Sequence, residues 1–328
     1  MNYPKTRLRR LRYNLNIREM FEDVSINKSD LIQPIFITDG HNVKNEIKGL
    51  DKQFQLSIDN CLNFCSELLE LGLKNIILFG VSELKDENGD IACSHNSIIP
   101  KAIKKIKEKF GDKLLVIADV CNCSYTNHGH CGTITNDEVD NDLTIQTLAK
   151  QSITLAEAGA DVIAPSDMMD GRVQLIRNEL DKKGFEKTPI FPYSVKYASS
   201  FYGPFRNAVD NIPKKGNRKS YQMNFKNSKE FIREIEQDLN EGADAVIIKP
   251  ALAYLDIIRE VKVKFNVPII AYNVSGEYSM VKAAAQKQYI DELEIILEII
   301  SSMKRAGADA IISYHSVEVV KYLNKTDV

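Results

Sequence analysis

The sequence is poor in the features that mark secreted, membrane-spanning and nucleic-acid-binding proteins. Its 328 residues include six unevenly spaced cysteines and no secretory leader, so we expect reduced thiols in a cytoplasmic protein rather than a disulfide framework. No stretch approaches the ~18 uncharged apolar residues of a membrane span, so no membrane partner is expected. The formal net charge of -2 gives no excess of basic charge for nucleic acid.

A recurring phrase organises the chain instead. It reads "EAGADVIAPS" at 157–166, "NEGADAVIIKP" at 240–250 and "RAGADAIISYH" at 305–315. The glycine suits the left-handed position just past a helix, and the short apolar run suits a strand buried on both faces of a parallel sheet. Amphipathic segments of helical length separate the copies.

This alternation predicts an α/β fold, a (β/α)8 TIM barrel over 31–328 with an N-terminal arm over 1–30. An open doubly wound sheet is the weaker alternative, because no GxGxxG motif opens a helix after a strand. The long irregular stretch at 197–222 is typical of an active-site lid. The predicted strands lie near 31–37, 75–80, 114–120, 161–167, 189–195, 245–250, 268–274 and 310–315.

Polar residues end many of these strands, where barrel enzymes carry their chemistry. They are Asp119, Ser166, Asp167, Lys196, Lys249, Ser275 and Tyr314.

Two lysines, Lys196 and Lys249, end consecutive predicted strands. At an effective dielectric near 20, two charges ~5 Å apart repel by roughly 3 kcal/mol. This repulsion would lower a lysine pKa towards neutrality and supply the free amine that a Schiff base with a ketone requires. The alternative is that both side chains extend into solvent.

Three cysteines, Cys121, Cys123 and Cys131, cluster in "DVCNCSYTNHGHCG". Thiolates suit zinc, and a flexible loop can bring three of them onto a tetrahedron. If His128 or His130 supplies a fourth ligand, the site is structural. If both stay out, the open position can hold water or substrate, and the metal is catalytic. Three unrelated thiols are the remaining alternative.

The predicted lid contains Arg206 and Arg218 beside the aromatics Tyr202 and Phe205. Guanidinium groups bind carboxylates bidentately, and aromatic rings exclude water when a loop closes. A solvated basic loop is the alternative.

An ordered set of motifs covering almost the whole chain resembles the porphobilinogen synthase (5-aminolevulinate dehydratase) family of the zinc-dependent type. The motifs are "DLIQPIFI", "DVCNCSYTNHGHCG", "GADVIAPSDMMDGRV", "KYASSFYGPFRNA", "NRKSYQMN", "GADAVIIKP" and "AYNVSGEY". The resemblance implies a homo-octameric lyase whose arm wraps a neighbouring subunit. It also implies the condensation of two molecules of 5-aminolevulinate into porphobilinogen for tetrapyrrole (haem) synthesis.

The resemblance also assigns roles by position. Lys249 and Lys196 match the Schiff-base lysines for the first and second substrates, and the three cysteines match the ligands of a catalytic zinc. Glu234 matches a glutamate that carries an allosteric magnesium in some members; a solvated helix glutamate is the alternative. Ser275 and Tyr314 match residues that hold the carboxylate of the first substrate, and Arg206, Arg218 and Gln222 match residues that hold the carboxylate of the second. Asp119, Ser166 and Asp167 match polar groups that line the pocket. The resemblance does not assign which of these three carries protons.

Two other functions remain open at this point. A single-Schiff-base aldolase or related lyase needs one lysine and no thiolate metal. A non-catalytic zinc scaffold needs no lysine.

Overall fold

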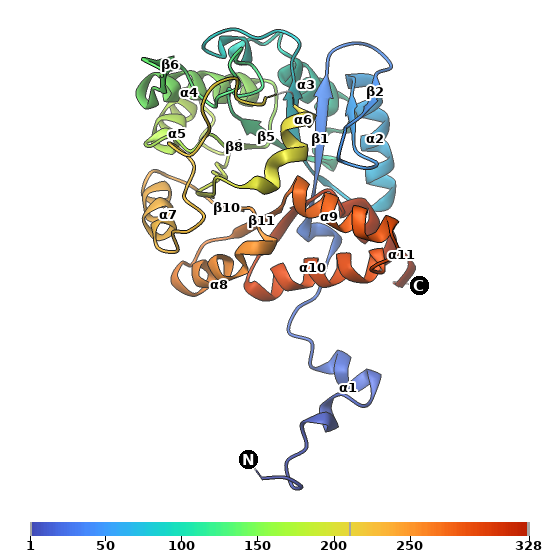
Figure 1. The fold of residues 1–328 in the computed structure, drawn as a ribbon. Helices are drawn as coiled ribbons and strands as arrows, with labels where there is room; N and C mark the ends of the chain where they lie inside the picture. Colours follow the sequence, from blue (N-terminus) through green and yellow to red (C-terminus); the bar gives the residue numbers. More distant parts are fainter. Residues whose placement is uncertain (1, 210, 327–328) are drawn as a thin grey trace.

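The chain folds into a closed ring of parallel strands surrounded by helices. The structure, a computed structural model, describes residues 2–209 and 211–326. In this part of the chain the strands follow the order β8, β5, β4, β1, β12, β11, β10, β9, and helices cover the outside of the ring (Figure 1). The predicted (β/α)8 barrel is therefore confirmed. The strands are β1 (Leu31–Thr38), β4 (Asn75–Val81), β5 (Leu115–Val120), β8 (Val162–Pro165), β9 (Val195–Lys196), β10 (Val246–Lys249), β11 (Ile269–Asn273) and β12 (Ala310–Ser313).

The fifth barrel strand is less regular than the sequence predicts. The prediction runs over 189–195, whereas the structure has a regular strand only at Val195–Lys196. Pro189 and Pro192 fall in the predicted segment and have no N–H to donate to a neighbouring strand. The carbonyl of Pro189 still accepts a hydrogen bond of 3.0 Å from the N–H of Ile163, and this contact closes the ring between β8 and β9.

The helices present an apolar face to the strands. In α7, Phe231 and Ile235 are fully buried one turn apart, as their four-residue spacing predicts. The helices are α1 (Leu15–Met20), α2 (Ile58–Leu71), α3 (Ile98–Phe110), α4 (Asn141–Glu157), α5 (Arg172–Lys182), α6 (Gly203–Ala208), α7 (Glu230–Asn240), α8 (Leu255–Lys264), α9 (Ser275–Gln286), α10 (Glu292–Ala306) and α11 (Ser316–Thr326).

The recurring Gly-Ala-Asp phrase has two structural roles. Its three glycines follow helices α4, α7 and α10 with positive φ, as predicted. The sequence did not reveal the role of the aspartates. Each carboxylate accepts a hydrogen bond from a backbone N–H near the start of the neighbouring strand, so each phrase links two strands. The pairs are Asp161 with Val116 (2.7 Å), Asp244 with Ile190 (2.8 Å) and Asp309 with Ile269 (2.9 Å).

The barrel interior is rich in aromatic residues. Tyr193 and Tyr272 have ring centroids 6.2 Å apart, and Tyr272 lies 6.3 Å from Tyr314. Phe36 and Phe79 pack at 5.6 Å from each other, and they continue this cluster, with Phe36 6.1 Å from Tyr314 and Phe79 6.4 Å from Tyr272. A separate apolar layer fills the space between the strands and the helices. The aromatic interior forms the floor on which the polar groups at the strand ends lie.

The remaining elements lie outside the ring. Residues 2–30, including α1, extend away from the barrel (Figure 1). Two short hairpins pair β2 (Lys44–Glu46) with β3 (Phe54–Leu56) and β6 (Ile134–Thr135) with β7 (Glu138–Val139). None of the helices described is both long enough and apolar enough to span a membrane.

Candidate active site

Two buried lysines lie side by side at the carboxyl end of the barrel. The strand register pairs Lys196 directly with Lys249, and each is about 5% exposed or less. The Nζ atom of Lys249 lies 4.2 Å from the ring centroid of Tyr272 and 5.2 Å from that of Tyr193. Lys196 Nζ lies 5.4 Å from the same Tyr193 ring. The lysines are therefore on adjacent strands, as the sequence predicts, and both lie over Tyr193.

The pKa of Lys249 is lowered to about 7, first by burial and then by the positive charge of Lys196. The sequence-based argument gave repulsion as the main cause, and the structure corrects that order. Burial has the larger effect because the ammonium group lies among aromatic rings and has lost its water. With a pKa near 7, a large fraction of Lys249 is a free amine at neutral pH and can attack a carbonyl carbon.

Asp119 and Ser166 lie next to the lysines. Burial raises the pKa of Asp119 to about 6, while the charges of Lys196 and Lys249 oppose this rise. The Oδ1 atom of Asp119 is buried and has no hydrogen-bond partner among the described residues. The backbone carbonyl of Ser166 accepts a hydrogen bond from Lys196 Nζ. A carboxyl group that titrates near neutral pH beside two amines can carry protons between them and a substrate.

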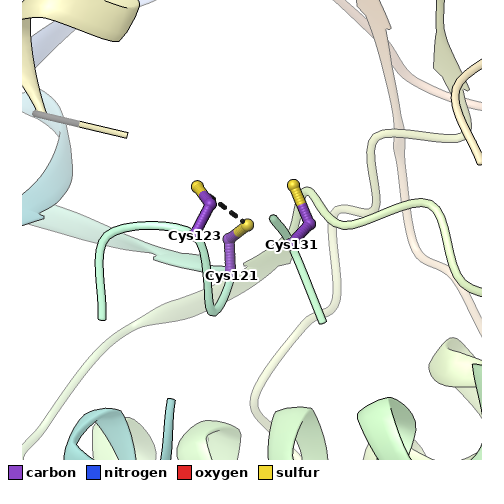
Figure 2. A group of neighbouring side chains, drawn as sticks. All are labelled: Cys121, Cys123 and Cys131. Carbon is purple, nitrogen blue, oxygen red and sulfur yellow. Dashed lines mark hydrogen bonds between the residues drawn. The ribbon is translucent and has the colours of Figure 1, made fainter. Parts of the chain in front are cut away.

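Three buried cysteines form a group that can hold a metal ion. The Sγ atoms of Cys121, Cys123 and Cys131 all lie within 4.8 Å of one another, and Cys121 and Cys123 are 3.2 Å apart (Figure 2). The pKa of Cys131 is lowered well below its usual value, mainly by hydrogen bonds from the other two thiols and further by Arg218. The donor set fits a thiolate metal site, because a thiolate and two thiols that can lose their protons face one another.

The two histidines of this loop are directed elsewhere. Within the described residues the metal-ligand group contains only the three cysteines. His128 Nε2 lies 2.9 Å from the Glu87 carbonyl, and His130 Nε2 lies 2.8 Å from the Lys215 carbonyl. Of the two alternatives left open by the sequence, this geometry favours a site with an open fourth position.

A small cavity joins the lysines, the cysteines and the predicted lid. Its volume of about 20 Å³ holds roughly one water molecule. The site is therefore closed, and a substrate can enter only if part of the wall moves. The lining residues are Phe79, Asp119, Cys123, Ser124, Ser166, Lys196, Tyr202, Phe205, Arg206, Arg218 and Lys249.

The residues predicted for the lid form one wall of this cavity. The Nη2 atom of Arg218 donates to the carbonyls of Gly129 and Asn211 at 2.8 and 2.9 Å. Arg206 lies in α6, and its Nε atom has no partner among the residues described. The Phe205 ring lies 4.7 Å from Lys249 Nζ. Two guanidinium groups therefore face a pocket whose other charged groups include two lysines.

The hydroxyl of Tyr202 donates to the Lys249 carbonyl at 3.1 Å, so it also holds the backbone of β10.

Ser275 and Tyr314 lie just behind the cavity wall. The Ser275 hydroxyl accepts a hydrogen bond of 3.0 Å from the N–H of Phe205 and donates to the Phe201 carbonyl at 3.2 Å. The Tyr314 hydroxyl lies 3.2 Å from that of Tyr272. In the closed state Ser275 thus holds α6, and movement of α6 would free its hydroxyl for a ligand.

Asp167 and Gln222 are not part of the cavity lining. One Asp167 oxygen accepts the N–H of Met169 at 2.7 Å, and the other lies 3.7 Å from Arg172 Nε. Burial raises the pKa of Asp167 to about 6. Gln222 borders a neighbouring cavity of about 280 Å³. Neither residue therefore lines the closed cavity that holds the lysine pair.

Glu234 does not line the cavity that holds the lysines but an open groove formed by residues of α4, α5 and α7. Burial raises its pKa to about 7.

Several residues at the site gave no signal in the sequence. Tyr193 lies under both lysines, and Asn211 donates to Cys123 Sγ at 2.9 Å. Tyr221 contacts His130 at 3.1 Å. Tyr193 is one of 13 tyrosines, and Asn211 and Tyr221 lie in a long polar loop. Only the fold shows which of these side chains face the site.

The barrel, the buried lysine pair with one depressed pKa and the three facing thiols together describe an α/β barrel with a nucleophilic amine and a group that could hold a metal. Comparisons with known proteins agree with this class. The chain matches the family "Delta-aminolevulinic acid dehydratase" over residues 5–322. It is 50% identical over 321 residues to the delta-aminolevulinic acid dehydratase of Methanothermus sociabilis, covering 98% of this chain and 99% of that protein.

The dehydratase of Bacillus subtilis (strain 168) is 48% identical over 323 residues, with 98% and 99% of the two chains covered. Among solved structures, delta-aminolevulinic acid dehydratase (porphobilinogen synthase) from Toxoplasma gondii ME49, in complex with the reaction product porphobilinogen, superposes with a TM-score of 0.95. The two chains are 43% identical, and 97% of this chain and 91% of that chain are covered. The chain belongs to the delta-aminolevulinic acid dehydratase family.

Proposed function

We propose that this chain is a porphobilinogen synthase that condenses two molecules of 5-aminolevulinate into porphobilinogen with loss of two waters. The observation that carries the proposal is the direct pairing of Lys196 with Lys249, whose pKa is lowered to about 7. A condensation of two ketones needs both carbonyls activated in one pocket, and two adjacent strand ends supply that arrangement. Family membership supports the same reaction.

In the proposed reaction each lysine amine attacks the ketone carbon of one substrate and forms an imine, with release of one water. One lysine leaves when the amino group of the other substrate replaces it on the carbonyl carbon. The second leaves by elimination after the new carbon–carbon bond has formed. Both lysines are thereby regenerated, and two waters are lost in total. In this proposal Asp119, whose pKa is raised by burial and lowered in part by the charges of both lysines, accepts and returns the protons of these steps.

Cys121, Cys123 and Cys131 would hold zinc, because three thiolates form a soft ligand set and leave one position open. A bound zinc supplies Lewis-acid polarisation of a substrate oxygen. In this proposal Arg206 and Arg218 hold the carboxylate of one substrate from a lid at 197–222, with Gln222 joining them when the lid shifts. Ser275 and Tyr314 hold the other carboxylate, and Tyr202 and Phe205 exclude water.

We further propose a homo-octamer in which the arm, residues 1–30, packs on a neighbouring subunit. Its exposed apolar side chains support this, because an isolated arm would leave them in water. They include Leu8, Leu11, Tyr13, Met20 and Phe21. Glu234 would carry an allosteric magnesium in the groove beside α7. The six free cysteines suit the reducing cytoplasm.

The test is incubation of the purified protein with 5-aminolevulinate alone, followed by a colour reaction for the pyrrole product. Formation of pyrrole supports the proposal, because a single-lysine aldolase and a zinc scaffold would both give none. Absence of pyrrole from the zinc-loaded protein would refute it.

A further inference from the structure

The proposed lid is fastened to the cysteine loop at several points. The fit is close at Gly129, where a side chain would bring a Cβ atom to 2.8 Å from the Ile212 carbonyl. Four hydrogen bonds join the two segments besides those of His130. They are Lys214 N–H to the His128 carbonyl (3.1 Å), Arg218 to the Gly129 carbonyl (2.8 Å), Asn211 to Cys123 Sγ (2.9 Å) and Cys131 N–H to the Tyr221 hydroxyl (3.4 Å).

His130 makes two further contacts across this interface, one with each ring nitrogen. Its Nε2 atom lies 2.8 Å from the Lys215 carbonyl, and its Nδ1 atom lies 3.1 Å from the Tyr221 hydroxyl. A carbonyl can only accept, so Nε2 carries the proton and donates it. In the neutral ring Nδ1 then keeps its lone pair and accepts the Tyr221 O–H. Both nitrogens are therefore used to hold the lid.

We propose that His130 is a positioning residue that latches the segment 214–221 onto the cysteine loop, and that it is not a metal ligand. A metal ligand needs a free ring lone pair directed at the metal, and the one lone pair of His130 is taken by Tyr221. The closed position of the lid and the conformation of the cysteine loop therefore depend on each other through the imidazole of His130. This inference rests on the proposed lid, but its test needs no substrate and so can fail independently of the proposed reaction.

His128 provides a matched control two residues away. It is the same residue type in the same loop, but its ring nitrogens contact the Glu87 carbonyl and the N–H of His130 rather than the lid. Its contact with Lys214 uses the backbone carbonyl, which a side-chain substitution leaves in place.

Trypsin offers a direct measurement, because the carbonyl that accepts the His130 bond belongs to the peptide bond that trypsin cleaves after Lys215. Lys215 is exposed, so protection must come from a fixed backbone. The full-length, zinc-loaded proteins His130→Ala, His130→Gln, His128→Ala and wild type would be compared by mass spectrometry. Cleavage after the exposed and distant Lys287 serves as the internal reference, and bound zinc is measured in parallel.

We expect His130→Ala to be cleaved after Lys215 about ten-fold faster than wild type, with unchanged cleavage after Lys287 and unchanged zinc content. His128→Ala should behave as wild type. His130→Gln should restore most of the protection, because the amide Nε2 can donate to the same carbonyl. If His130→Ala does not fold, Tyr221→Phe tests the Nδ1 contact and should give a smaller but similar increase.

Two outcomes would overturn the proposal. Equal cleavage after Lys215 in His130→Ala, His128→Ala and wild type would show that no latch exists. Loss of bound zinc from both His130 variants, with zinc retained in His128→Ala, would show that His130 is a metal ligand.

Discussion

The two sides of the active-site cavity are built in different ways. The lysine side consists of neighbouring strands, whose ladder hydrogen bonds set the spacing of Lys196 and Lys249. The thiol side consists of loops, in which side chains bind backbone carbonyls across the gap between the lid and residues 128–131. The difference fits the roles proposed for the two sides. Covalent chemistry needs a fixed geometry, whereas a metal and a lid need a wall that can open.

The largest expected loss of activity comes from substitutions on the lysine side. Lys249→Met should lower kcat by about 10⁴-fold or more, because no other group can take over a nucleophile whose position and pKa the barrel sets. Borohydride trapping with labelled 5-aminolevulinate and peptide mapping would check the assignment. Lys196→Met should also lose turnover yet still trap label at Lys249. Label at neither lysine in wild type would end the imine mechanism.

Removal of the metal tests the opposite side. Chelation should lower activity by about 10³-fold, because a Lewis acid supplies several kcal/mol of stabilisation to the transition state. The barrel should stay folded, with a thermal midpoint within about 5 °C of the zinc-loaded protein. The three cysteines pack into the core between strands and helices, but the strand ladders and most residues of that core lie outside the cysteine loop. Circular dichroism would measure whether the zinc-free protein stays folded, and the activity recovered after zinc is added back would measure the contribution of the metal. Full activity without zinc would refute a catalytic metal.

Substitutions in the lid should lower activity less than substitution of the lysines or removal of the metal. Arg206→Leu and Arg218→Leu each remove a charged hydrogen bond of about 1.5 to 3 kcal/mol and should cost roughly ten-fold or more in kcat/KM. We expect the larger loss for Arg218, because it also holds Gly129 and Asn211. Steady-state kinetics with 5-aminolevulinate would compare them. An unchanged kcat/KM in both variants would remove the arginine clamp.

The pH dependence of imine formation at Lys249 tests the lysine side separately from the thiol side. Imine trapping at Lys249 should be slow below pH 7 and rise to a plateau above it, because its pKa of about 7 sets the fraction of free amine. In Lys196→Met the midpoint should move to higher pH, since a repelling charge has been removed. The same lowered pKa makes the folded state gain stability as pH rises from about 7 to 10, because there the unfolded lysine binds more protons. Rates of imine trapping in wild type and Lys196→Met, measured from about pH 5 to about pH 9, would test this shift of the midpoint.

The smallest change in activity is expected from magnesium at Glu234, which lies outside both sides of the active-site cavity. Magnesium should raise activity of the zinc-loaded enzyme about two-fold to five-fold, and Glu234→Gln should abolish that increase while leaving basal activity intact. Activity and native mass would be measured with and without magnesium. If neither changes in wild type, Glu234 is not a magnesium ligand.

The sequence was most informative where spacing and strand order carry the information. The Gly-Ala-Asp phrases located helix ends and strands, and the lysines could be placed on adjacent strands because consecutive barrel strands are neighbours. The three cysteines are close in sequence, so their proximity in space follows from a short loop. The irregular fifth strand was missed because apolar content hid the effect of Pro189 and Pro192 on the ladder.

Contacts between distant segments could not be predicted in this way. Whether His130 faces the metal or the lid depends on a loop 85 residues further along, and nothing local in "NHGHCG" distinguishes it from His128. The position of Asp167 against Arg172 rather than the cavity likewise depends on how the turn after β8 packs.

The sequence by itself therefore determined the barrel, the pair of lysines and the cysteine trio, because periodicity, strand order and short spacing are local properties of a chain. Only the tertiary structure decided the state of those groups. Burial among aromatic rings from several strands sets the pKa of Lys249, and packing of the lid on the cysteine loop sets which nitrogen, oxygen or sulfur atoms face the cavity. Desolvation and long-range contact arise only when distant segments come together, so no local pattern can report them.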